Sequence, residues 1–150
     1  MDALPTTDPE VVHNCQADYD AAFRSASQDE VDSARFRLAW ALVHSTDTGH
    51  VRRGLNLARA KLQDKAKMKA SDVRDMSYLA AVARFRLGEY LAARTEIKEL
   101  LREHPDCRQA EALQKLCDDC ILRDGLLGVG VGLGATLLGI GLAVLFSSKK

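Results

Sequence analysis

Residues 78–105 read YLAAVARFRLGEYLAARTEIKELLREHP and contain the clearest fold signal in the sequence. Gly88 and Tyr90 mark a turn between two helical segments, Ala93 follows three residues after Tyr90, and Pro105 ends the second segment. Small residues at such positions let two helices cross closely, while larger residues fill the groove between neighbouring helices. The stretch therefore predicts a tightly packed pair of antiparallel helices.

The same stretch fits a known repeat period. With Ala81 at the small position of its first helix and with Ile97 and Leu100 in its second, it matches the 34-residue tetratricopeptide pattern from the second half of that pattern onward. Residues 34–62, ARFRLAWALVHSTDTGHVRRGLNLARAKL, form a degenerate upstream copy that has Gly54 at the small position but lacks the closing proline. Two repeats in tandem are therefore predicted.

The pattern of residues 11–123 is helical throughout, and no proline interrupts it before Pro105. Caps and breakers, among them Asp29 and the turn at 46–49, divide it into six helices. The expected helices cover about 10–27, 30–45, 50–62, 72–88, 90–103 and 107–123. The predicted fold class is all-α: a six-helix tetratricopeptide-like antiparallel array, followed by a single C-terminal transmembrane helix.

The C-terminal stretch carries the transmembrane prediction. From Leu126 to Phe146 there are 21 residues without a charge, and as a helix they would span about 31 Å, close to the ~30 Å hydrocarbon core of a bilayer. Lys149 and Lys150 follow, so the apolar stretch is sharply bounded. Because nothing N-terminal is apolar enough to target the nascent chain, we expect a tail anchor with the preceding domain in the cytosol.

Two other interpretations of this stretch are weaker. Gly130, Gly132 and Ala135 formally fit the dinucleotide-binding fingerprint, but no strand precedes them and no βαβ unit surrounds them. A buried soluble helix would rarely hold so many glycines, each of which costs about 1 kcal/mol of helix propensity in water. Gly128 and Gly132 are spaced to let two spans approach closely, which would make a homo-oligomer possible; alternatively the glycines only lower the hydrophobicity for targeting.

The domain organisation follows from these boundaries. A flexible N-terminal arm is expected at 1–9, a cytosolic helical domain at 10–124, the transmembrane anchor at 125–146 and a short basic tail at 147–150. A short, glycine-diluted span with a basic tail favours the mitochondrial outer membrane and the peroxisomal membrane over the secretory pathway.

Composition argues against an enzyme and against a nucleic-acid-binding protein. Lys+Arg and Asp+Glu are both 21, so no excess of basic charge marks a nucleic-acid footprint. No phosphate-binding loop, nucleophile elbow or metalloprotease helix occurs, and we expect no cofactor and no metal. Cys117 and Cys120 form a C-x-x-C pair inside an expected helix, which favours core or half-buried thiols; redox sensing and metal binding stay open as lesser alternatives.

Several motifs resemble one family. Leu38 to Val43 (LAWALV) with Ser45, 51–54 (VRRG), and 85–90 (FRLGEY) are similar, in register, to the mitochondrial fission protein one family, and so is the Asp124–Leu126 start of the apolar stretch. The resemblance covers about residues 30–150 and implies tail-anchored adaptors on mitochondria and peroxisomes. Such adaptors recruit a dynamin-related GTPase, directly or through soluble adaptors, for organelle fission. In some members the N-terminal arm folds over a groove; here, with two prolines, we expect a loose arm.

In tetratricopeptide arrays the first helix of each pair lines the concave face. Helical spacing therefore predicts a partner-binding groove formed by Leu38, Leu42, Tyr78, Val82, Phe85 and Arg86; the alternative for each of these residues is a place in the core, which the same spacing also favours. Trp40, Leu55, Leu79, Tyr90 and Leu101 are assigned to the core. A tail-anchored receptor for chaperone or precursor peptides is the alternative function; such receptors hold a carboxylate with several Lys and Asn, whereas the predicted groove offers Arg86 and no Asn.

Overall fold

The computed structural model describes residues 4–125. Its labelled helices are α1 (Pro9–Ser25), α2 (Gln28–Val43), α3 (Thr48–Leu62), the short 3-10 helix η1 (Lys65–Lys67), α4 (Ala70–Arg86) and α5 (Tyr90–Glu103). A sixth helix includes residues 108–125 of the described chain. These helices confirm the predicted all-α, six-helix array, with bounds within a few residues of those expected.

The predicted anchor lies outside the described residues. This holds for Leu126, Gly128, Gly132, Phe146, Lys149 and Lys150, and for the basic tail at 147–150. Within residues 4–125, no helix combines the length and apolarity needed to cross a bilayer. The transmembrane helix therefore stays a prediction from the sequence.

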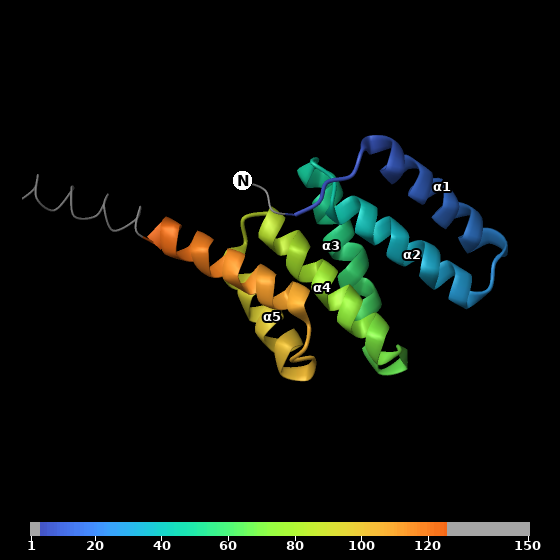
Figure 1. Cartoon of the computed structure of the whole chain (residues 1–150). Coiled ribbons are helices and arrows are strands. Elements are labelled where there is room, and N and C mark those ends of the chain that lie inside the picture. Colours follow the sequence, from blue (N-terminus) through green and yellow to red (C-terminus); the bar gives the residue numbers. More distant parts are fainter. Residues whose placement is uncertain (1–3, 126–150) are drawn as a thin grey trace, which may run out of the picture.

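Successive helices pack against one another in chain order, and α2 also contacts α4 (Figure 1). The main core cluster joins α2, α3, α4, α5 and the sixth helix through fully buried side chains such as Val43, Val82, Ile97 and Leu113. A second cluster, with Val12, Leu38, Ala41 and Leu42, lies between α1 and α2. Leu55 and Leu79 are buried as predicted, and Tyr90 and Leu101 are half-buried.

Local capping sets the helix starts. Ser27 is the N-cap of α2 and forms a capping box with Glu30, so the helix begins two residues earlier than the predicted Asp29 cap allows. The carboxylate of Asp47 accepts hydrogen bonds from the backbone N–H groups of Gly49 and His50, at 2.7 and 3.1 Å, and starts α3. These contacts satisfy N–H groups that would otherwise lack a partner at a helix N-terminus.

Two glycines sit where the fold needs them. Gly54 of α3 faces α2 so closely that an added Cβ would lie 2.8 Å from Val43 Cγ2 and 3.0 Å from the Val43 backbone nitrogen. Gly88, between α4 and α5, has a φ of 77°, a conformation that side chains disfavour. Both positions agree with the roles that the repeat pattern assigned to them.

The N-terminal arm is held against the domain, which differs from the loose segment expected. The Thr7 N–H donates to the His44 carbonyl at 2.9 Å, and the Thr7 hydroxyl donates to the Ala41 carbonyl at 2.8 Å. Arg86 of α4 donates to the Pro5 carbonyl at 2.5 Å. Composition alone did not reveal these contacts, because backbone carbonyls at the end of α2 supply most of the acceptors.

Candidate partner-binding face

The outward stripe of α2 consists of Ser33, Arg37 and Trp40, spaced four and three residues apart and all exposed. Trp40 has 39% of its surface exposed, which is unusual for so large an apolar side chain. On the neighbouring helix, Arg86 is half-buried and bonds the arm. We define the α2–α4 face by five residues: Ser33, Arg37 and Trp40 on α2, and Asp75 and Arg86 on α4.

This arrangement corrects part of the predicted groove. Leu38 and Leu42 are 0% exposed and pack beneath α1, in a cluster with Val12. Val82 is also 0% exposed, within the main core cluster. Helical spacing placed Leu38 and Leu42 correctly on one stripe of α2, but it could not tell that α1 covers that stripe. The open stripe is the neighbouring one.

The assignment of Trp40 to the core was wrong for the same reason. Its exposed face lies on the mixed stripe with Ser33 and Arg37, which sequence reasoning did not single out. The signal was available: a large aromatic residue on a stripe that otherwise carries a serine and an arginine is out of place in a core and typical of a contact surface. Trp40 is therefore the exposed aromatic residue of this face that the groove prediction missed.

Two predicted groove residues lie at the other edge of α4. Phe85 packs on Tyr90 of α5, with ring centroids 5.3 Å apart and planes tilted by 56°. Tyr78 lies near Cys107 at the start of the sixth helix, and burial, with a smaller contribution from that thiol, raises the pKa of Tyr78. Both side chains are half-buried, and their neighbours named above belong to the later helices. Their part in binding stays a prediction.

An aromatic–histidine pair ends the stripe on α2. The His44 ring stacks on Trp40 at a centroid distance of 4.4 Å, and its Nδ1–H donates to the Trp40 carbonyl at 2.9 Å. Burial lowers the pKa of His44; the hydrogen bond to Trp40 opposes this shift, and the nearby Arg86 cation adds to it. His44 is therefore neutral at physiological pH and holds Trp40 at the surface.

The arm crosses this end of the face. Thr7 forms an isolated parallel β-bridge with Ser45, directly after the His44 backbone. Pro5 bonds to Arg86 on α4, and Leu4 packs against the main core cluster. Residues 4–7 thus connect the C-terminal ends of α2 and α4, beside Trp40.

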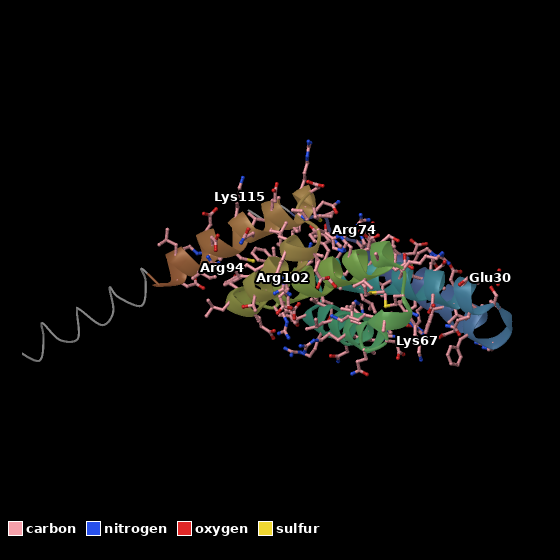
Figure 2. The ribbon with its side chains drawn as sticks, turned by 90° about the horizontal axis from the view of Figure 1, so that it is seen from below. Glu30, Lys67, Arg74, Arg94, Arg102 and Lys115 are labelled. Carbon is pink, nitrogen blue, oxygen red and sulfur yellow. The ribbon has the colours of Figure 1, made fainter. Side chains whose placement is uncertain are left out.

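A cleft of about 520 Å³ occupies the other end of the face, between the first turns of α2 and α4. Its apolar floor comprises Phe36, Met68 and Met76. Its charged rim is balanced, with the acidic side chains Asp29, Asp32, Asp72 and Asp75 and the basic side chains Arg37, Lys61, Lys67 and Lys69; Figure 2 shows Lys67 at this end. Such a balanced rim suits a partner with charges of both signs.

A larger cleft, about 660 Å³, lies on the opposite side of α4 and is bounded by α3 and α5. It holds Asn56, Arg59 and Lys65, but the glutamates 96, 99 and 103 line it too. Arg84 pairs with Glu96 and Glu89, each at 2.5 Å. Repulsion from these glutamates disfavours binding of a free carboxylate at this cleft.

The cysteines do not form a reactive cluster in the described chain. All four are free, and no group of three or more His, Cys, Asp or Glu side chains within residues 4–125 is arranged to hold a metal ion. Cys117 is 0% exposed, which agrees with its assignment to the core, and burial raises its pKa to about 11. A thiol that keeps its proton is a poor nucleophile and a poor metal ligand.

The fold defines a class: a small tetratricopeptide-like helical array, with the α2–α4 face on the first helices of its two repeats. Family models agree, because the Fis1 N-terminal tetratricopeptide repeat matches residues 33–65 and the Fis1 C-terminal tetratricopeptide repeat matches residues 74–126. The crystal structure of fission protein Fis1 from Saccharomyces cerevisiae has the same fold, with a TM-score of 0.68 over 85% of this chain and 94% of that one, at 22% identity.

The sequences of relatives settle the family. Mitochondrial fission 1 protein A of Arabidopsis thaliana is 33% identical over 99% of this chain and 89% of its own length. Mitochondrial fission 1 protein of Homo sapiens is 35% identical over 72% of this chain and 68% of its own length. The chain belongs to the mitochondrial fission 1 protein family, as the motifs at 38–43, 51–54 and 85–90 indicated.

Proposed function

We propose that this protein is a tail-anchored adaptor of the mitochondrial outer membrane and the peroxisomal membrane, which recruits the organelle-division machinery through the α2–α4 face. The partner would be a dynamin-related GTPase or one of its soluble adaptors. Family membership supports the role in fission, and the uncharged sequence of 126–146 supports the anchor.

One observation carries the choice of face: Trp40 is exposed on the first helix of the first repeat and stacks on His44, which lies near Arg86 on the first helix of the second. Tryptophan and arginine are the residue types most enriched among those that dominate binding energy at protein interfaces. The apolar floor and balanced charges of the adjoining 520 Å³ cleft extend the face to a length that suits a helix or an extended segment.

A solved relative supports the kind of partner. Yeast Fis1 has been crystallised in complex with an Mdv1 fragment containing an N-terminal extension and a coiled-coil domain. That structure superposes on this chain with a TM-score of 0.66 at 24% identity, over 83% of this chain and 92% of that one. By analogy, we propose that this protein binds a segment of an adaptor of that kind.

The test compares two exposed aromatic residues. Full-length protein carrying Trp40→Ser should lose binding to an adaptor fragment of this type by about tenfold or more, the effect expected of a central aromatic anchor. Phe23→Ser is the matched control, because Phe23 is 68% exposed but lies on α1, away from the face. Equal binding by both variants would remove the face assignment.

Cells provide the readout of function. With N-terminally tagged protein, the intact chain should surround mitochondria and shorten them, whereas Trp40→Ser should reach the organelle without shortening it. If both variants reach mitochondria and neither changes their length, the adaptor role fails and a peptide receptor becomes the better hypothesis. Salt-sensitive binding of a peptide with a free carboxylate would then support the receptor.

A further inference from the structure

Two exposed leucines mark the end of the domain from which the chain continues toward its apolar stretch. Leu91 is 69% exposed in the first turn of α5, and Leu122 is 64% exposed near the end of the described sixth helix. The other large apolar side chains that are exposed within residues 4–125 are Val11, Phe23 and Trp40. Of these five side chains, Leu122 is nearest in sequence to Leu126, and Leu91 lies on the helix that pairs with the one carrying Leu122.

Contacts between the two helices bring these leucines to one edge. Arg94 of α5 pairs with Asp118 of the sixth helix, and Tyr90 interacts with Cys120 (Figure 2 labels Arg94). The contact of the earlier residue of α5 is with the later residue of the sixth helix, so the two helices are antiparallel. Leu91 precedes Arg94 by three residues and Leu122 follows Asp118 by four, so both leucines lie about one turn beyond this ion pair, on its side of the helix pair.

The height of this edge relative to a bilayer follows from helix geometry. Leu122 precedes Leu126, the first residue of the predicted span, by four residues, or about 6 Å of helix rise. The headgroup region on each side of a bilayer is about 5–7 Å thick. If the sixth helix continues into the span, as the sequence predicts, both leucines lie at the depth of the lipid headgroups.

We infer that the edge formed by Leu91 and Leu122 rests on the membrane surface, so that the domain is held against the bilayer by α5 as well as by the anchor. This inference depends on the predicted span. The nearby charges are paired, Arg94 with Asp118 and Arg123 with Asp124 at 3.6 Å, so neither sign of charge dominates the edge. The occupant is therefore the apolar–polar boundary of a lipid bilayer, and anionic lipid is not required.

Contact with the membrane would also orient the binding face. The α4–α5 turn at Gly88 and the Arg86 end of α4 lie next to the start of α5, so they would lie close to the membrane as well. The 520 Å³ cleft, formed at the starts of α2 and α4, would lie at the far end. A bound partner would then have a fixed orientation relative to the membrane, because the domain could not rotate freely about the anchor.

Single-tryptophan variants of the full chain test the contact. Trp40 is the only tryptophan, so a Trp40→Phe background allows a new one at Leu91, at Leu122 or at a control site. Each variant is reconstituted into phosphatidylcholine vesicles with acyl chains brominated near the headgroup, which quench nearby tryptophan. Lys98→Trp is the matched control: Lys98 is exposed on the same side of α5, seven residues or about 10 Å farther along the helix.

We expect the brominated lipid to quench the emission of tryptophan at positions 91 and 122 and to leave the emission of tryptophan at position 98 unchanged. Quenching at 122 alone would overturn the inference, because Leu122 is close to the anchor whether or not α5 touches the membrane. A shift in the emission of Trp at position 91 that depends on protein concentration in unbrominated vesicles would point to a second copy of the chain and would overturn it too.

The anchor is tested separately in the same samples. Flotation of the vesicles on a density gradient shows whether the chain is membrane-bound. A chain that fails to float contradicts the predicted span and the membrane part of the proposed function. If the chain floats but tryptophan at position 91 is not quenched, only the proposed contact of the Leu91–Leu122 edge with the membrane is contradicted.

Discussion

The His44 ring stacks on Trp40 at 4.4 Å and donates a hydrogen bond to the carbonyl of the same residue at 2.9 Å. One buried histidine thus holds the exposed aromatic residue of the α2–α4 face, while its own backbone carbonyl accepts the Thr7 N–H of the arm. This position links face, arm and core, and it leads to a prediction about pH.

The protein should become less stable as the pH drops, because of His44. Burial lowers the pKa of His44 in the folded protein, so the unfolded chain takes up the proton first as the pH drops through the ordinary value of 6.5. The free energy of unfolding should therefore decrease from pH 7.5 toward 5.5. His44→Phe, which keeps a ring against Trp40 but cannot titrate, should show a smaller decrease in urea unfolding of the full chain in detergent. Equal pH dependence in both proteins would show that His44 is not responsible.

Loosening the arm should strengthen partner binding. The Thr7 hydroxyl donates a hydrogen bond to the Ala41 carbonyl at 2.8 Å. Loss of this bond should weaken the docking of the arm by about 0.5–1.5 kcal/mol. For a partner that must displace the arm, this corresponds to an increase in affinity of about two- to tenfold. Thr7→Ala should bind the adaptor fragment more tightly by about this factor, as measured by titration calorimetry. Thr6→Ala, an exposed neighbour, is the control. If only the control binds more tightly, or if neither variant does, the arm does not compete with the partner for the face.

Two glycine substitutions should destabilise the protein for different reasons. Gly54→Ala forces a Cβ to within 3.0 Å of the Val43 backbone, and such overpacking costs about 1–3 kcal/mol. Gly88→Ala meets no atom within 4 Å but must adopt a φ of 77°, at a cost of about 1–2 kcal/mol. Gly88→Asn should recover part of that loss, since asparagine tolerates this conformation, whereas Gly54→Asn should not. Urea unfolding of all four variants checks the distinction.

The ion pairs of Glu96 should contribute unequally. Arg84, with 15% of its side chain exposed, holds Glu96 at 2.5 Å, whereas Arg59, 55% exposed, lies 4.0 Å away. Arg84→Met leaves Glu96 and Glu89 without that partner and should cost about 1–3 kcal/mol, because the Arg84 side chain that holds both carboxylates is largely shielded from water. Arg59→Met should cost less than about 1 kcal/mol, as exposed pairs do. Similar losses in thermal unfolding would show that solvent screens the Arg84 pairs as well.

The helices, the repeat period and the family could all be predicted from the sequence. Periodicity, caps and breakers act within a few residues, so the bounds of α4 and α5, the turn at Gly88 and the close approach at Gly54 could be predicted locally. The apolar stretch at 126–146 likewise needs only composition to predict a span. The assignments of Leu55, Leu79 and Cys117 to the core followed from the same patterns.

Which stripe of each helix stays open could not be predicted, because it depends on how the helices pack. Helix α2 has apolar residues on adjoining stripes, and α1 covers the one with Leu38 and Leu42 while leaving Trp40 exposed. Long-range contacts also fixed the arm, since Thr7 meets a helix end 34 residues away. Helical spacing records that a residue repeats on one side of its own helix. Which neighbour covers that side depends on how distant segments pack, and local sequence does not encode that choice.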